Sequence, residues 1–307
     1  MAGDPVAAVD IGTNSTNLLI VDPNGVSRRR VTITRLGAGV DATRRLHDDA
    51  IERTLRVLAE YRTEIAAAGA TAVRAVATSA ARDAANREEF LDAAAQVLGV
   101  RPEVVTGDEE ARLAFRGAVE AVRATSEPPW AVLDIGGGST ELMLGDDNEL
   151  RSVSIDVGAV RVTELLLRSD PPRADELANA IGLVQDHLDD VVRELPGLLE
   201  SPSFVGIAGT ITTVAAVEIG LPTFDPDAID GFRLSKEACE DVFRTLATEP
   251  LADRVHNPGL PRERADVIVG GCCVLVAVMR RLHLSSITVS VRSLLDGVAA
   301  ELLARGV

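Results

Sequence analysis

Two short segments of the chain carry the same arrangement of an aspartate, glycines and hydroxyl side chains. Residues 6–20 read VAAVDIGTNSTNLLI, and residues 130–144 read WAVLDIGGGSTELML. In both, an apolar stretch ends in Asp-Ile-Gly and a Ser-Thr pair opens a second apolar stretch. Two apolar stretches joined by a glycine-containing turn predict a β-hairpin. The two copies, each near the start of one half, indicate two similarly folded domains that arose by duplication.

The turns of these hairpins could bind phosphate. Backbone N–H groups exposed on one side of a turn form a nest that holds phosphate oxygens without a lysine. Hydroxyl donors stand beside them, Thr13 and Ser15 in the first copy and Ser139 and Thr140 in the second. The alternative is an ordinary hairpin turn, which explains one copy well but two matched copies poorly.

Asp10 and Asp134 end the first strand of each hairpin. A carboxylate at the end of an apolar strand is costly unless it is hydrated, paired or bound to a cation. We therefore expect Mg²⁺ and phosphate to be bound where the two copies face each other. Glu141, on the second strand of the second copy, is either a further metal ligand or a solvated side chain.

Three further positions have residue types suited to phosphate hydrolysis. Carboxylates at 108–110 begin a predicted helix, where they could serve as caps, or one of them could position an attacking water. Arg82 follows a strand-to-helix turn and could contact phosphate or lie on the surface. Gly209 and Thr210 lie between a strand and a helix, which is typical of an anion site or of a packing turn.

The rest of the sequence alternates strands and helices and predicts an α/β fold. A boundary is expected at Thr125–Pro129, which gives domains at 1–125 and 126–307, with the last helix able to pack back on the first domain. The expected helices are 47–68, 84–98, 106–123, 174–194, 235–247, 262–283 and 294–304; the expected strands after the first hairpin include 73–77, 104–105, 204–208 and 287–291.

Composition excludes several classes of protein. The net charge of -16 disfavours general binding to nucleic acid or to anionic membranes. Three cysteines without paired spacing suit a reducing cytosol, and the four histidines have no zinc-ligand spacing. The apolar run at 267–279 is too short to span a bilayer and predicts a buried helix. Together with the lack of a signal-peptide pattern, these features predict a cytoplasmic protein.

In order along the chain, the segments VDIGTNSTNLL, AVATSAARDAAN, TGDEEARLAF, VLDIGGGSTEL, GIAGTITTVAAV and RADVIVGG resemble the exopolyphosphatase / guanosine pentaphosphate phosphohydrolase (Ppx/GppA) family. The resemblance covers almost the whole chain. It implies an actin-like (ASKHA) fold, in which two ribonuclease-H-like domains enclose the active site in the cleft between them. It also implies Mg²⁺-dependent hydrolysis of polyphosphate or of guanosine pentaphosphate, and a homodimer.

The resemblance also implies roles for individual residues. Glu110 is similar to the catalytic base and Arg82 to the phosphate-contacting arginine, while Asp10, Asp134 and Glu141 resemble the acidic residues that hold Mg²⁺ or order the water. The phosphate-binding loops are matched by Thr13, Asn14, Ser15, Gly136, Gly137, Gly138, Ser139, Gly209 and Thr210.

Two features depart from the family pattern. We expect a short form without the C-terminal HD-type region of long members, and the family's late Leu-Arg-Glu-Gly motif reads Leu294-Leu295-Asp296-Gly297. Because the arginine of this motif is missing and lysines are absent from the expected cleft, short polyphosphates are the expected substrate. The alternatives are a guanosine pentaphosphate 5′-phosphohydrolase, an ATP-dependent phosphotransferase of the sugar-kinase or actin type, and a non-catalytic sensor of guanosine tetra- or pentaphosphate.

Overall fold

The computed structural model describes residues 4–22, 25–120, 122–201 and 203–305, so the outermost ends of the predicted domains lie outside it. The chain forms two compact units, Met1–Gly117 with Leu294–Val307 and Ala118–Ser293. The division lies within helix α5 (Gly107–Glu120) instead of after residue 125. The last helix, α13 (Leu294–Ala304), belongs to the first unit.

The first unit is built on one mixed sheet with the strand order β3-β2-β1-β4-β5. Strands β1, β2 and β3 form an antiparallel meander, whereas β4 and β5 run parallel to β1. This is the ribonuclease-H-like topology. The strands are β1 (Val6–Ile11), β2 (Ser15–Asp22), β3 (Gly25–Ile33), β4 (Ala72–Ala77) and β5 (Glu103–Val104).

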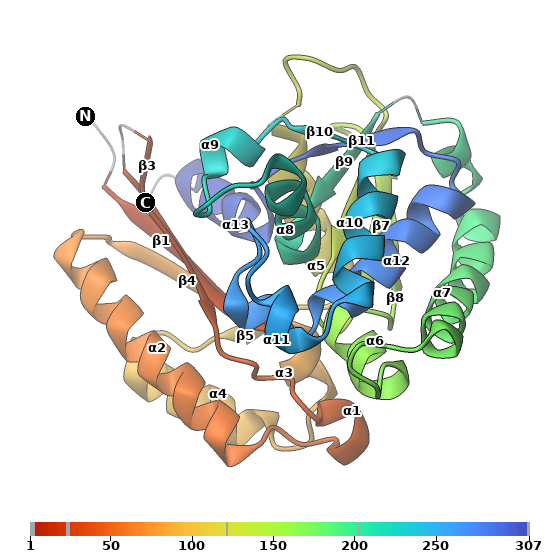
Figure 1. Cartoon of the computed structure of the whole chain (residues 1–307). Helices are drawn as coiled ribbons and strands as arrows, with labels where there is room; N and C mark the ends of the chain where they lie inside the picture. Colours follow the sequence, from red (N-terminus) through yellow and green to blue (C-terminus); the bar gives the residue numbers. More distant parts are fainter. Residues whose placement is uncertain (1–3, 23–24, 121, 202, 306–307) are drawn as a thin grey trace. The chain divides into compact units, whose positions relative to one another are not determined.

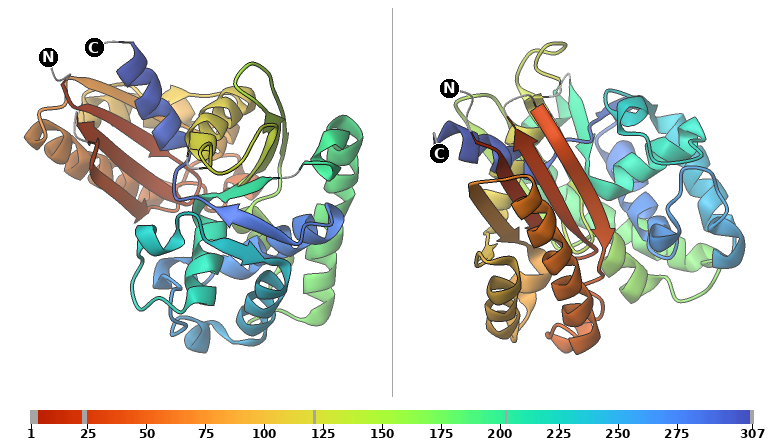
Figure 2. Two further views of the ribbon diagram at one scale, coloured as in Figure 1. Left: turned by 90° about the horizontal axis from the view of Figure 1, so that it is seen from above. Right: turned by 90° about the vertical axis from the view of Figure 1, so that its left-hand side faces the viewer.

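Both faces of this sheet are covered by helices. Ala7, Val9 and Ile11 alternate along β1 and share a core with α2 (Asp48–Ala67) and α4 (Arg87–Leu98), which lie side by side in Figure 1. Because successive side chains of a strand point to opposite faces, Val6 and Asp10 belong to the other face. There α13 packs along β1, as the first view in Figure 2 shows.

The second unit repeats this topology and adds one strand, in the order β10-β11-β9-β6-β7-β8. Its hairpin of β6 and β7 is antiparallel, and β9 runs parallel to β6. The chain is therefore an α/β protein with two ribonuclease-H-like units, the actin-like class that the sequence predicts. The strands are β6 (Trp130–Ile135), β7 (Thr140–Gly145), β8 (Leu150–Ile155), β9 (Phe204–Ile207), β10 (Arg233–Ser235) and β11 (Ser286–Val289).

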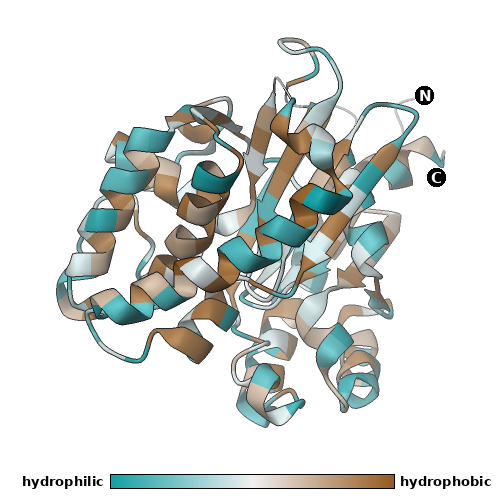
Figure 3. Cartoon of the chain, turned by 90° about the vertical axis from the view of Figure 1, so that its right-hand side faces the viewer, coloured by the Kyte–Doolittle hydropathy of each residue, from teal (hydrophilic) through white to brown (hydrophobic). Residues whose placement is uncertain are grey.

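Amphipathic helices pack against the sheet of the second unit and share its hydrophobic core. Along α7 (Ala174–Glu194) the buried residues Ala180, Val184, Leu188 and Val191 recur at helical spacing, and Figure 3 shows helices banded with polar and apolar residues. The other helices are α1 (Val40–Thr43), α3 (Ser79–Asp83), α6 (Ala159–Leu166), α8 (Ala208–Ile219), α9 (Pro226–Ile229), α10 (Lys236–Thr248), α11 (Leu251–Arg254) and α12 (Ile268–Arg281), with 3₁₀ turns η1 (Pro196–Leu199) and η2 (Arg262–Arg264).

The apolar run at 267–279 forms the buried helix that the sequence predicts: every residue of α12 from Ile268 to Met279 is buried. The predicted start of this helix at residue 262 is wrong. Arg262–Arg264 instead form the turn η2, and the helix begins at Ile268. Among the described residues, no helix combines the length and the apolar character needed to cross a membrane.

Candidate active site

Asp10 lies near the end of β1, directly opposite Asn17 on β2. The amide Nδ2 of Asn17 donates a hydrogen bond of 2.9 Å to Asp10 Oδ2. In the part of the chain that the structure describes, Asp10 Oδ1 and Asn17 Oδ1 are both buried and accept no hydrogen bond. Burial raises the pKa of Asp10 to about 7; Asn17 opposes this shift, and the negative charge of Glu110 adds to it. Two unsatisfied oxygens beside each other favour a proton or a cation at this point.

Glu110 is separated from its acidic neighbours on the first turn of α5. The hydroxyl of Thr106 accepts a hydrogen bond from the Glu109 N–H and so caps the helix, and the Glu109 carboxylate pairs with Arg74 at 2.7 Å. Glu110 instead accepts a 3.0 Å bond from Arg82 Nη1. The cap of this helix is thus the hydroxyl of Thr106, whereas the sequence had offered the carboxylates at 108–110 for that role. Glu110 therefore stays a candidate for positioning a water.

The pair of Glu110 and Arg82 is largely shielded from solvent, with side-chain exposures of 13% and 27%. Burial raises the pKa of Glu110, and the Arg82 guanidinium partly opposes this shift. A carboxylate with a raised pKa is a stronger base than a free one, and it still has the arginine to orient it. Arg82 is fixed in turn, because its Nη1 also donates to the Val105 carbonyl at 3.0 Å.

The turn after β1 has hydrogen-bonded carbonyls but leaves two of its N–H groups without a partner among the described residues. Gly12 N–H donates to the Ser15 carbonyl at 2.9 Å, while the carbonyls of Thr13 and Asn14 accept bonds from the segment at 34–37. Within the described ranges, the N–H groups of Thr13 and Asn14 donate to no protein acceptor. Donors left free in a turn of this kind can bind an anion.

The matching turn in the second unit has the same design. Gly136 N–H donates to Ser139, and N–H groups at the start of α6 occupy the carbonyls of Gly136 and Gly137. A Cβ on Gly158, at this helix start, would lie 2.5 Å from the Gly137 carbonyl oxygen, so only glycine allows the contact. The N–H groups of Gly137 and Gly138 donate to no acceptor that the structure describes.

Asp134 and Glu141 face each other across β6 and β7, at the positions that Asp10 and Asn17 occupy in the first unit. Glu141 is only 2% exposed, and the Ser154 hydroxyl donates to its Oε1 at 2.9 Å. The suggestion that Thr140 offers its hydroxyl to phosphate is wrong, because that hydroxyl donates to the Val157 carbonyl. Sequence reasoning placed Glu141 at this site but missed Ser154 and Asn17.

Gly209 and Thr210 lie in the first turn of α8, which follows β9 directly. Because β9 is the parallel neighbour of β6, Ile207 is level with Asp134 and the helix starts just beyond it. Ala208 has a positive φ of 68°, a strained conformation for a residue with a Cβ. Strain of this kind is concentrated at functional sites.

An arginine that sequence reasoning gave no role lies on this helix start. A Cβ on Gly209 would come within 1.8 Å of Arg264 Nη1, so the guanidinium packs against the glycine backbone. Burial alone lowers the pKa of Arg264 to about 10, which still leaves it charged at neutral pH. Among the described residues it has no ion pair or hydrogen bond from its side chain. A cation at the positive end of a helix, with no counter-ion, favours an anionic ligand.

The oxygen donors of each unit suit Mg²⁺ that is shared with a substrate. No cluster of three or more acidic, histidine or cysteine side chains with metal-binding geometry occurs in the described ranges. Mg²⁺ commonly uses one or two carboxylates and completes its shell with water and phosphate oxygens. The buried, unsatisfied Asp10 Oδ1 and the adjacent pair of Asp134 and Glu141 are donors of this kind.

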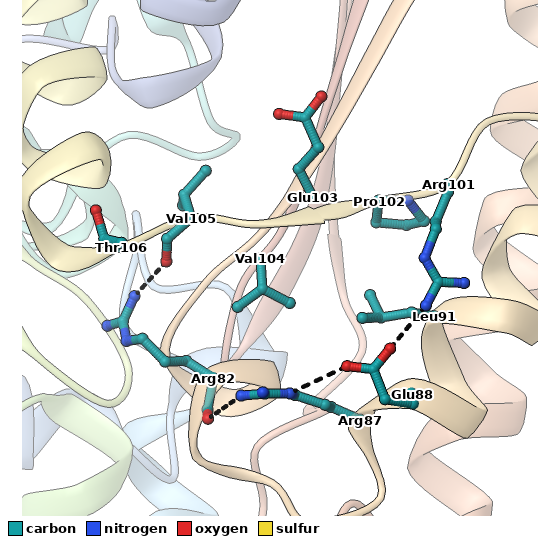
Figure 4. A pocket seen from close by; sticks show the side chains of 10 residues that line it. All are labelled: Arg82, Arg87, Glu88, Leu91, Arg101, Pro102, Glu103, Val104, Val105 and Thr106. Atoms are coloured by element: carbon teal, nitrogen blue, oxygen red, sulfur yellow. Dashed lines mark hydrogen bonds and ion pairs between the residues drawn. The ribbon is translucent and has the colours of Figure 1, made fainter.

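A surface cavity of about 580 Å³ lies beside Arg82, between α4 and the segment at 101–106 (Figure 4). Glu88 pairs with both Arg87 and Arg101, and Arg87 also donates to the Arg82 carbonyl at 3.3 Å. These ion pairs neutralise the arginines of the cavity and hold the backbone of Arg82. The cavity therefore supports Arg82 more than it offers an anion site.

The chain belongs to the Ppx/GppA phosphatase family, whose family model matches residues 20–305. It is therefore a phosphoanhydride hydrolase. It is 41% identical to Exopolyphosphatase 2 of Mycobacterium tuberculosis over 98% of this chain and 99% of that protein. It is 28% identical to the guanosine-5′-triphosphate,3′-diphosphate pyrophosphatase of Aeromonas salmonicida, over 97% of this chain but 59% of the relative.

Solved structures show the same fold. The Ppx/GppA family member of Aquifex aeolicus is 32% identical, with a TM-score of 0.80 over 99% of both chains. An exopolyphosphatase-like protein is 36% identical, with a TM-score of 0.93 over 98% of this chain and 99% of the other. The family resemblance stated from the sequence motifs is confirmed.

Proposed function

We propose that this protein is an exopolyphosphatase that releases the terminal phosphate of inorganic polyphosphate, with short chains preferred. The observation that carries the proposal is Glu110: a shielded carboxylate with a raised pKa, oriented by Arg82 and close enough to Asp10 to influence its titration. The nearly full-length similarity to a protein named Exopolyphosphatase 2 supports the choice of substrate.

In the proposed reaction Glu110 accepts a proton from a water molecule, and the water oxygen attacks the terminal phosphorus. The bond from phosphorus to the bridging oxygen breaks, which leaves inorganic phosphate and a chain shorter by one phosphate. Catalysis of this kind depends mainly on orienting the nucleophile and neutralising charge. In the first unit Arg82 and the free N–H groups of the glycine turn would neutralise phosphate charge, and in the second unit the free N–H groups of the matching turn would do so.

Arg264 and the start of α8 supply a further positive site for phosphate oxygens. Mg²⁺, when bound, would add a strong positive charge to phosphate oxygens. In the first unit Asp10 would hold such an ion, and in the second unit Asp134 and Glu141 would. The chain's net charge of -16 makes such local positive sites necessary for any polyanionic substrate.

The proposal is tested by measuring phosphate release from tripolyphosphate, with and without Mg²⁺. Glu110→Gln removes the base but keeps the size of the side chain, and we expect kcat to fall by about 10²–10⁴-fold. Glu109→Gln is the matched control, because the neighbouring carboxylate pairs with Arg74 outside the site. Unchanged phosphate release by Glu110→Gln would refute the assignment of the base.

The same assay distinguishes the other candidate functions. Faster release from guanosine pentaphosphate than from tripolyphosphate would favour the second family activity, which a relative's name carries. Transfer of phosphate from ATP to an added acceptor would favour a phosphotransferase. Tight nucleotide binding without turnover would favour a sensor.

A further inference from the structure

The segment between α10 and α12 is held by one buried arginine, Arg254, which is 3% exposed. Its guanidinium donates to the carbonyls of Leu246 at 2.7 Å, Glu249 at 2.7 Å and Ala265 at 3.1 Å. The carboxylate of the half-exposed Asp170 lies 3.4 Å from the same guanidinium. The buried arginine is thus satisfied mainly by backbone carbonyls from both ends of the segment.

Ala265, one of these three carbonyl acceptors, directly follows Arg264. The turn around Arg264 is closed by its own N–H, which donates to Pro261, and by its carbonyl, which accepts from Val267. Arg254 therefore fixes the peptide that follows Ala265, one residue beyond the Cα from which the Arg264 side chain reaches Gly209. An arginine side chain alone has several rotatable bonds and would not hold such a position without a rigid base.

The same segment touches α8 a second time. Gly259 has a φ of 80°, and a Cβ there would lie 2.2 Å from the Ala216 carbonyl oxygen. The backbone at 259 thus rests on the last turns of α8, while Arg264 rests on its first turn. Arg254 joins the two ends of the segment that makes both contacts, through its bonds to the carbonyls of Leu246, Glu249 and Ala265.

We propose that Arg254 is a positioning residue: its bonds to main-chain carbonyls keep the Arg264 guanidinium on the N-terminus of α8, ready for a phosphate oxygen of the substrate. The inference rests on the proposed function, since it assigns Arg264 to substrate phosphate. The two arginines have different roles. The Arg254 guanidinium donates hydrogen bonds to three main-chain carbonyls, whereas the Arg264 guanidinium donates none to the described residues.

A double-mutant cycle tests this role, with Arg254→Met, Arg264→Ala and the double variant. We expect Arg264→Ala to lower kcat/KM for tripolyphosphate on the order of 10- to 100-fold, the range for a lost charge-assisted hydrogen bond. Arg254→Met should lower kcat/KM roughly tenfold, chiefly through KM. The double variant should match Arg264→Ala, because a positioning residue has nothing left to position.

Two further variants serve as a rescue and as a control. Arg254→Lys can restore some of the carbonyl contacts and should recover part of the activity lost in Arg254→Met. Arg262→Ala changes an arginine of the same turn whose side chain is exposed, and should leave kcat/KM unchanged. The fluorescence of Trp130, the only tryptophan and a residue of the second unit, reports whether each variant folds.

A readout without turnover separates this inference from the proposed function. Tripolyphosphate should raise the melting temperature of the wild type and of Arg262→Ala, and raise it less in Arg254→Met and Arg264→Ala. If the wild type binds tripolyphosphate but releases no phosphate, the proposed function fails and the binding cycle still tests Arg254. If the effects of the two arginine substitutions multiply in the double variant, the positioning role is refuted.

Discussion

Replacing Asp10 by asparagine should stabilise the first unit above neutral pH while it abolishes phosphate release. Asp10 is buried beside Asn17, its Oδ1 accepts no hydrogen bond from the described residues, and Glu110 repels its negative charge. Asparagine has nearly the same shape and carries no charge. The substitution therefore removes the cost of burying the carboxylate and keeps the packing at the end of β1.

The size of the effect follows from the pKa. Burial raises the pKa of Asp10 from 3.8 to about 7. A difference of one in pKa corresponds to about 1.4 kcal/mol, so a rise of about three sets an upper bound near 4 kcal/mol. Because the pKa of Asp10 is higher in the native state than in the unfolded state, the native state binds the proton more tightly. The stability of the wild type is therefore highest below about pH 4 and declines as the pH rises towards 7. The Asp10→Asn variant has no such loss.

The assay is urea unfolding of both proteins between about pH 4 and 8 in the presence of EDTA. Tyr61 is the only tyrosine of the chain and lies buried in the first unit, so its ultraviolet absorbance reports on the unit that contains Asp10. The advantage of Asp10→Asn should grow up to about pH 7 and level off above it. Adding Mg²⁺ should recover wild-type stability and leave Asp10→Asn unaffected, since a cation satisfies the carboxylate.

Asp146→Asn is a control in the second unit, where the pKa of the carboxyl is lowered instead of raised, and its unfolding is followed by the fluorescence of Trp130. Backbone N–H groups of Asn148 and Glu149 bond to Asp146 and lower its pKa. Its contribution is present above the ordinary pKa and is lost as the pH falls, so this variant should be no more stable than the wild type at about pH 8. A pH-independent difference for Asp10→Asn, or a loss of stability above neutral pH, would contradict the reasoning about Asp10.

Three other predictions concern a hydrogen bond, a helix contact and an ion-pair cluster within the units. Ser154→Ala removes the hydrogen bond to buried Glu141 and should weaken the Mg²⁺ dependence of activity, measured as a several-fold rise in the Mg²⁺ concentration needed for half-maximal rate. Gly297→Ala, although alanine favours helices, should destabilise the first unit by about 1–3 kcal/mol in urea unfolding, because the new Cβ would lie 2.0 Å from the Leu113 carbonyl oxygen. Arg74→Met should destabilise it by about 3 kcal/mol, since three carboxylates lose their shared cation, and high salt should reduce the loss.

The late motif that departs from the family pattern finds its explanation in the first unit. Asp296 of the Leu-Leu-Asp-Gly segment pairs with Arg29 on β3 at 2.5 Å, and Gly297 lets α13 approach the main chain at Leu113. Leu295, which stands where the family pattern has an arginine, is buried. The segment therefore serves the packing of α13 within the first unit.

Local patterns were enough to predict much of this protein. Hairpin turns, amphipathic helices and the buried run of α12 depend on residues close together in sequence, so periodicity and glycine placement reveal them. The predicted start of α12 was wrong because the polar turn Arg262–Arg264 and the helix share no boundary signal such as a capping residue. The duplication also predicted that Asp10 and Asp134 end equivalent strands, as they do.

What the amino-acid order alone determined is the family, the two repeated hairpins and a first set of candidate residues, from which Asn17, Ser154 and Arg264 were missing. Only the tertiary structure decided which of them meet. Arg82 reaches Glu110 because β4 lies beside β1 and β5 beside β4, and Arg264 reaches Gly209 because a loop folds back over α8. Such contacts join residues far apart in the chain, and their geometry comes from strand order and core packing, which no local spacing records.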